Sequence, residues 1–232
     1  MILELVVGFI LSIANFFGEQ ITKKIHPHVR SKMISFGAGI AITYLFLQLF
    51  PELYDGVRVI NKVMYVYVLL GFTAFHILEK HIYQHLDRER LHRELKEAHS
   101  LALFIYHFVL GIIVVRLFAD HFLEGLLFIL PLTFHTIVSG ISMEDIHYGI
   151  KEKKILRILL SSAPLAGVLF ALLLHVSAII FYMLLGFVVG AMLYVTIRDI
   201  LPKERKCHVE YFLSGSFLYA LLIILLWMYV PA

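Results

Sequence analysis

Long apolar segments recur along the whole chain and constrain its fold more than any other feature. Each is close to the roughly 17 to 25 residues that a helix needs to cross the hydrocarbon core of a bilayer. Lipid offers no hydrogen bonds to backbone amides, so such segments must be helical. We therefore predict an all-α, polytopic membrane protein with eight transmembrane helices, at residues 2–18, 33–50, 63–82, 100–118, 123–145, 155–175, 176–198 and 211–230.

The composition agrees with this prediction and excludes several other classes of protein. Apolar residues make up 60% of the 232 residues and charged residues only 16%, against about 25% charged residues in a soluble domain. A net charge of +3 and scattered basic clusters argue against a nucleic-acid partner. The one cysteine, Cys207, allows no internal disulfide. The polar segments are too short for a soluble domain, so residues 1–232 are expected to form a single transmembrane domain.

Basic residues predict the orientation in the membrane. All lysines and arginines except Arg58, Lys62 and Arg116 lie in or beside the loops that follow odd-numbered spans. Short loops rich in Lys and Arg stay in the cytoplasm. The first span lacks the basic start and cleavage site of a secretory signal, so we expect it to be retained. These patterns predict a multi-pass integral protein of the cell membrane with both termini outside.

The second and seventh spans share an internal similarity. GIAITYLFLQLFP, from Gly39 to Pro51, and GAMLYVTIRDILP, from Gly190 to Pro202, have the same spacing between glycine and proline. The two helices would cross in opposite directions, as inverted repeats of secondary transporters do. The repeat predicts a 3+2+3 arrangement, in which spans one to three match six to eight around a central pair. Coincidence is the alternative, because glycine at helix crossings and proline at helix ends are common.

Polar side chains in spans four and five are the candidates for chemistry, because polar groups deep in a membrane are costly and often functional. Neutral imidazoles on neighbouring helices can bind one metal ion together. A structural hydrogen bond to a carbonyl or hydroxyl on the next helix is the alternative for each histidine. The polar set comprises Tyr106, His107, Thr133, His135, Thr136 and Ser139.

Two prolines are expected to break helices near these residues. Pro131 has no N–H and leaves the carbonyl of Leu127 without its usual helical donor, and Pro164 does the same to Leu160. Broken helices at this depth are typical of substrate sites in transporters.

Several segments resemble the ZIP (Zrt/Irt-like) family of metal transporters. The segment SFGAGIAITYLFLQLFPEL is similar to the second helix of the family, LLGFVVGAMLYVTIRDILPK to the seventh, SSAPLAGVLFALLL to the sixth, and LEK at Leu78–Lys80 to the end of the third. The resemblance implies an inverted-repeat ZIP-like bundle. It also implies transport of a divalent metal such as zinc, iron or manganese toward the cytoplasm by alternating access, with no bound cofactor and no enzymatic activity.

The central metal motifs of the family are reduced in this chain. A His-Asn-x-Pro-Glu/Asp-Gly type segment is matched by YHFVLG at residues 106–111, and a His/Gln-Glu/Asn-x-Pro-Glu-Gly type segment by HTIVSG at residues 135–140. The resemblance implies His107 and His135 as metal ligands. Without carboxylates a buried cation lacks charge compensation. We therefore expect weaker zinc binding, a softer or monovalent ion, or lost transport. The auxiliary oxygens would come from Tyr106, Thr136 and Ser139.

A second histidine group follows the third span. One helix over KHIYQHLDRERLHRELKEAHS would place all four of its histidines on a single face, and the His-x-x-x-His spacing of the first two suits metal chelation. The resemblance implies a receiving or sensing role for metal in the cytoplasm. An ordinary solvated helix is the alternative. The histidines are His81, His85, His92 and His99, and the same side of the membrane holds His26, His28 and His208.

A short acidic segment before the fifth span offers a third site for cations. DHFLEG, residues 120–125, mimics the metal motif but lies only ten residues before His135. We predict that it sits at the outer end of a helix, where Asp120, His121 and Glu124 could form an entrance site.

Two other functions compete with transport. A non-transporting ZIP-like scaffold or metal sensor would keep the fold without the flux. An intramembrane metalloenzyme using His81 and His85 is disfavoured, because Ile82 stands where a metalloprotease has its glutamate. The expected partners are metal ions and the lipid bilayer. Small residues at 35–39 and 186–190 would allow close helix packing or a homodimer.

Overall fold

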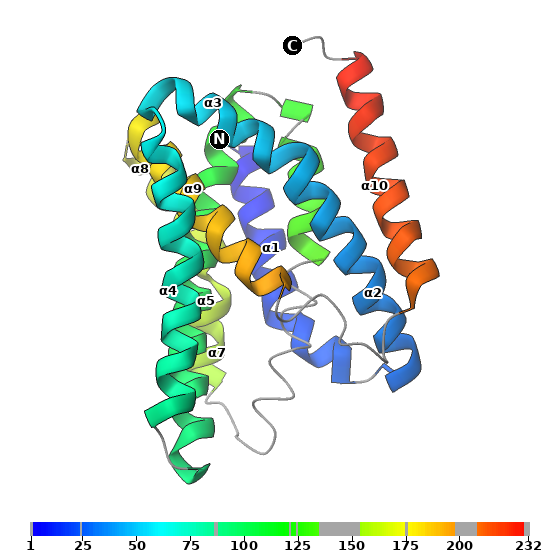
Figure 1. Cartoon of the computed structure of the whole chain (residues 1–232), viewed down its shortest axis with the longest axis vertical. Coiled ribbons are helices and arrows are strands. Elements are labelled where there is room, and N and C mark those ends of the chain that lie inside the picture. The colour runs from blue at the N-terminus through cyan, green and yellow to red at the C-terminus, as the bar shows by residue number, and fades with distance from the viewer. Residues whose placement is uncertain are drawn as a thin grey trace.

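The computed structural model is an all-helical bundle in the residues that it describes (Figure 1). These residues are 2–23, 25–85, 88–120, 122–123, 125–134, 154–174, 176–197 and 208–229. The elements are α1 (Ile2–Lys23), α2 (Pro27–Tyr44), a π-helical turn η1 (Leu45–Leu49), α3 (Phe50–Ile60), α4 (Val63–His85), α5 (Arg88–Asp120), α7 (Lys154–Ser161), α8 (Ala163–Leu173), α9 (Ala178–Val195) and α10 (Val209–Tyr229). Residues 125–134 are also helical.

Local sequence signals account for several of the helix ends. Pro27 occupies the first turn of α2, where its missing N–H costs no helical hydrogen bond. The Ser177 side chain accepts a hydrogen bond from the Ile180 amide at 3.4 Å and caps the start of α9. Asn61 ends α3 with a φ of 56° and a ψ of −161°, a conformation that L residues rarely adopt, and turns the chain into α4.

Apolar helices extend through the described part of the chain. Three are long and apolar enough to cross a membrane, at residues His28–Ile60, Ala178–Val195 and Val209–Met228. Shorter apolar helices lie at Ile2–Gly18, Val63–Leu78, Leu103–Ala119, Gly125–Phe134 and Ala163–Leu173. Every predicted span therefore contains an apolar helix, which is the make-up of a multi-pass membrane protein. The number of crossings stays a prediction.

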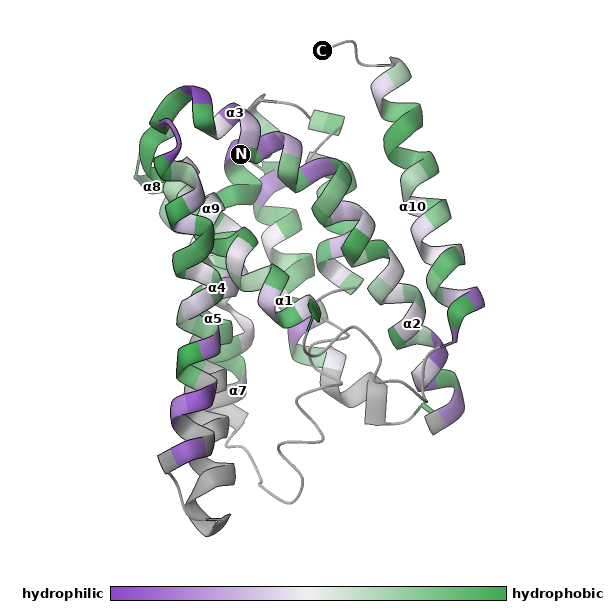
Figure 2. Ribbon diagram, in the orientation of Figure 1, coloured by the Kyte–Doolittle hydropathy of each residue, from purple (hydrophilic) through white to green (hydrophobic). Residues whose placement is uncertain are grey.

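The hydropathy of the residues changes along the long axis of the bundle in the way expected for a membrane protein. Apolar residues dominate the middle of the helices, and polar residues gather toward the two ends (Figure 2). The outer helix α10 exposes Leu213, Phe217 and Met228, whose exposed fractions are 59%, 71% and 75%. In a bilayer these side chains would face lipid.

Three pairs of helices pack through reciprocal glycines. In each pair, a glycine of one helix lies against the backbone of its partner, and the partner returns the contact with a glycine of its own. A Cβ atom at Gly190 would meet the carbonyl of Val68, and one at Gly71 would meet the carbonyl of Phe187. Small residues of this kind let membrane helices approach closely. The pairs are Gly39 and Gly215 between α2 and α10, Gly71 and Gly190 between α4 and α9, and Gly111 and Gly167 between α5 and α8.

Irregular turns interrupt two of the predicted spans. The sixth is split at Ser162 into α7 and α8, two residues before Pro164, so the predicted break is confirmed. In the second, the π turn η1 joins α2 to α3 without ending the helix. The π-helical conformation recurs at Thr196 and Ile197, directly after α9.

Substituting Gly190 with alanine tests the contact between α4 and α9. The new methyl group would meet the Val68 carbonyl, which can move away only if the two helices separate. We expect Gly190→Ala to destabilise the protein by about 1–3 kcal/mol, the usual cost of overpacking. Thermal unfolding of the purified protein in detergent measures the change.

Gly186→Ala is the matched control for this measurement. Gly186 lies one turn earlier on α9, and its added Cβ would meet the Tyr67 Cβ at 3.0 Å instead of a carbonyl at overlapping distance. Gly186→Ala should lower the midpoint temperature of thermal unfolding less than Gly190→Ala does. Equal midpoints would show that the close backbone approach does not limit stability.

Candidate functional site

His107 is held in one orientation inside the bundle. It lies on α5 with 3% of its surface exposed, and its Nδ1 is 2.8 Å from the carbonyl oxygen of Leu103, one turn earlier. A carbonyl only accepts hydrogen bonds, so Nδ1 carries the proton and donates it, and the lone pair of the neutral ring is on Nε2. Metal-binding histidines are usually oriented in this way. The same bond also fits the alternative of a structural histidine, with the acceptor on its own helix.

Tyr106 belongs to a buried group of tyrosines, which we name the tyrosine cluster and which contains Tyr44, Tyr106 and Tyr219. Its members come from α2, α5 and α10, and each is at most 2% exposed. The ring centroids of Tyr44 and Tyr219 are 6.2 Å apart. All three tyrosines belong to the same cluster of buried core residues. Spans far apart in the sequence therefore bring phenol groups together in the middle of the bundle.

Tyr219 hydrogen-bonds the carbonyl that Pro131 deprives of its helical donor. Its hydroxyl donates to the Leu127 oxygen at 3.0 Å and lies 3.4 Å from Oε1 of Gln48. The predicted unpaired carbonyl thus receives its hydrogen bond from α10. An unsatisfied carbonyl in this apolar interior would be costly, so Tyr219 stabilises the helix around Pro131. Residues 125–134 stay helical through Pro131, so the break predicted there is not seen in the described residues.

The polar partners of Tyr219 were absent from the sequence-based set of candidates. Tyr44 and Gln48 are four residues apart and share a face of the second span. Gln48 also lies within the π turn η1, and π turns are frequent at functional sites. That spacing within an apolar segment was the available signal for Tyr44 and Gln48.

Part of the predicted metal site lies outside the described residues. His135, Thr136 and Ser139 belong to that part, so a joint site of His107 and His135 stays a prediction. Within the described residues, three or more His, Cys, Asp or Glu side chains do not come together in a way that could hold a metal ion.

The prediction of one helix face carrying four histidines is wrong. His81 and His85 lie at the end of α4, whereas His92 and His99 lie in α5, which begins at Arg88. The chain must reverse here so that both of its long apolar helices can pack in the bundle. A helical face therefore holds at most two of the four. The His81 side chain is exposed.

The acidic segment starts at a helix end, because Asp120 is the last residue of α5. His121 and Glu124 lie outside the described residues. An entrance site formed by these three residues stays a prediction.

Comparison with known proteins adds no relatives to this description. No family model matches the chain, and no curated protein is significantly similar to it in sequence. The resemblance to ZIP transporters therefore rests on the sequence segments quoted above.

Substituting Tyr219 with phenylalanine tests its hydrogen bond to the Leu127 carbonyl. Tyr219→Phe leaves the Leu127 carbonyl buried without this donor, and we expect a loss of about 1–3 kcal/mol of stability. Tyr44→Phe is the matched control, because among the described residues the buried Tyr44 hydroxyl has no hydrogen-bond partner. It should change stability little. Thermal unfolding in detergent measures both.

A second substitution separates this bond from simple packing. Pro131→Ala restores an N–H that can donate to Leu127. In the Pro131→Ala background, Tyr219→Phe should lower the free energy of unfolding clearly less than it does in the natural sequence. A double-mutant cycle measures this difference. Equal costs in both backgrounds would refute the role assigned to Tyr219.

Proposed function

We propose that the chain is a ZIP-like transporter that moves a divalent metal ion, such as zinc, iron or manganese, toward the cytoplasm. The observation that carries this proposal is a set of structural features that recur at one constant spacing along the chain. In the second span, the buried Ser35 and the glycine Gly39 precede the start of the π turn at Leu45. At one constant offset in residue number, the seventh span has a counterpart for each position: Gly186 for Ser35, Gly190 for Gly39 and the π-helical Thr196 for Leu45.

The helix contacts support the same repeat. The helix of span two packs against that of span eight through Gly39 and Gly215, and span seven packs against span three through Gly190 and Gly71. If spans one to three are matched with spans six to eight, span two corresponds to span seven and span eight to span three. The contact between spans two and eight then corresponds to the contact between spans seven and three. An inverted repeat with 3+2+3 organisation would produce this relation.

The most extensive helix contacts form three pairs, α4 with α9, α2 with α10, and α5 with α8. The contacts between these pairs are less extensive: α5 touches α9 and α4, and the α2–α10 pair reaches α9 through η1 and α3. Movement of one set of helices against another is how many secondary transporters alternate access to their site. The candidate residues Tyr106 and His107 lie on α5, which joins two of these pairs.

The proposed path for the metal passes His107 and His135, with Tyr106, Thr136 and Ser139 as oxygen donors. In this arrangement the eight predicted spans cross the cell membrane with both termini outside. Zinc prefers about four ligands from nitrogen, sulfur and carboxylate, and the motif carboxylates are missing here. The metal would therefore bind weakly, as a cargo that must also be released.

The missing carboxylates also favour a second candidate function. A ZIP-like scaffold or metal sensor would need the helical framework but no charge-compensated pathway. This alternative predicts that metal flux is absent or independent of the two histidines.

Replacing both histidines tests transport. In proteoliposomes tested with zinc, iron and manganese, the His107→Ala and His135→Ala double variant should lower uptake roughly tenfold or more, because even indirect support of a metal ligand is worth 10- to 100-fold. His76→Ala is the control, since His76 also lies on an apolar helix but is exposed. Uptake that the double variant leaves unchanged would favour the scaffold or sensor.

A further inference from the structure

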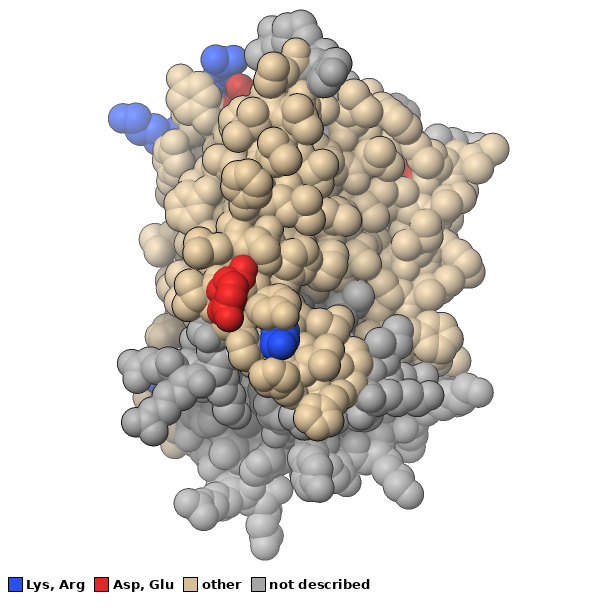
Figure 3. Space-filling model, turned by 90° about the vertical axis from the view of Figure 1, so that its right-hand side faces the viewer, with Lys and Arg blue, Asp and Glu red and all other residues tan. Residues whose placement is uncertain are grey.

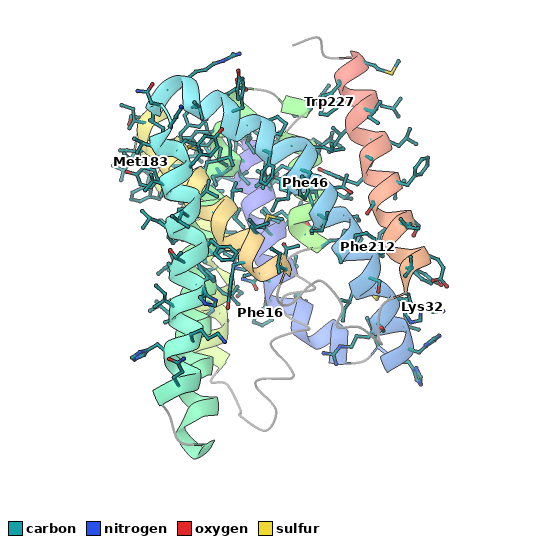
Figure 4. All side chains as sticks on the ribbon, viewed as in Figure 1. Phe16, Lys32, Phe46, Met183, Phe212 and Trp227 are labelled. Carbon is teal, nitrogen blue, oxygen red and sulfur yellow. The ribbon has the colours of Figure 1, made fainter. Side chains whose placement is uncertain are left out.

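A cleft lies where α2 and α10 begin, away from the tyrosine cluster. Both helices start at the same end of the molecule and run side by side, and Figure 4 shows Lys32 at this end. The His208 amide donates to the Ser35 hydroxyl at 3.1 Å and ties the two starts together. The cleft has a volume of about 550 Å³ and is lined by His28, Lys32, His208, Glu210, Tyr211 and Ser214.

The cleft presents one positive and one negative side chain that do not neutralise each other. The Lys32 ammonium stands 5.1 Å above the centre of the Tyr211 ring. Within the described part of the chain, neither Lys32 nor Glu210 has an ion-pair partner. On the face shown in Figure 3, an acidic group and a basic group of the described residues lie near each other with uncharged atoms between them. A ligand that carries both charges could therefore bind between them.

Donor groups favour a phosphate near Lys32. The rings of His28 and His208 lie 5.3 Å apart and nearly perpendicular, at 84°, and both residues line the cleft. The N-terminal ends of α2 and α10 add positive partial charge on the same side. Glu210, in the first turn of α10, supplies the acceptor for a positive group.

The position of the cleft places it at the depth of lipid headgroups. It opens at the ends of two of the helices that are long and apolar enough to cross a membrane. Beyond the cleft, α10 continues with exposed apolar side chains, among them Leu213, Phe217 and Leu221. Acyl chains could follow this surface while the headgroup stays in the cleft. Basic pockets between membrane helices are known to bind lipid headgroups.

We propose that this cleft binds the headgroup of an ethanolamine glycerophospholipid, with the phosphate at Lys32 and the imidazoles and the primary ammonium at Glu210. The Glu210 carboxylate would repel a purely anionic headgroup. It would also gain less from choline, which has no N–H to donate. The site is independent of metal transport and of the two histidines in the proposed path.

Native mass spectrometry of the purified chain with defined lipids tests the site. The unmodified protein should retain phosphatidylethanolamine more strongly than phosphatidylcholine or phosphatidylglycerol. Lys32→Gln should weaken retention about fivefold, the effect of roughly one interfacial lysine, and Lys32→Arg should restore it. Lys62→Gln, in the turn between α3 and α4, is the control and should have no effect.

Glu210→Gln provides the sharper test, because it should change the order of preference. Losing the carboxylate removes the ammonium partner and the repulsion of anions, so phosphatidylglycerol should now bind better than phosphatidylethanolamine. An unchanged order would overturn the proposal, as would an equal effect of Lys62→Gln. Displacement of the lipid by millimolar inorganic phosphate would assign the cleft to soluble phosphate instead and would also overturn it.

Discussion

Close contact between helix backbones is the interaction on which the rest of this structure depends. Within a bilayer, apolar side chains gain nothing from leaving lipid for one another, so helices associate through tight packing and polar contacts. The reciprocal glycines provide that packing at three interfaces. Because backbone meets backbone, dispersion contacts and weak Cα–H···O bonds add along the whole crossing. The three most extensive helix–helix contacts are these same interfaces.

Rigid pairs of this kind allow the irregular segments to exist between them. A proline break or a π turn exposes backbone groups that lipid cannot satisfy. The Leu127 carbonyl is satisfied instead by Tyr219, which lies one turn after Gly215 on α10. The glycine contact with α2 thus sets the position of α10, and α10 in turn brings a hydroxyl to the carbonyl that Pro131 leaves without a donor. Packing and polar satisfaction depend on each other here.

Much of the fold could be predicted from the sequence, because apolar length and proline chemistry are local properties. The positions of the apolar helices, the break before Pro164 and the deprived carbonyl at Leu127 all follow from neighbouring residues. The partner of that carbonyl does not, since Tyr219 is distant in sequence and reaches it only through the tertiary fold. The four histidines were assigned to one face because helix periodicity does not reveal where a chain reverses. For His107 the sequence predicted burial, but the choice of Leu103 as acceptor needed coordinates.

The reciprocal glycines also limit how such a chain can diverge. Each contact needs a glycine on both helices, so a side chain added at one glycine cannot be offset by a smaller residue on the other helix. Descendants could exchange leucine, valine and phenylalanine freely on lipid-facing surfaces without disturbing this framework. The spacing of the paired glycines would therefore change more slowly than the apolar residues around them.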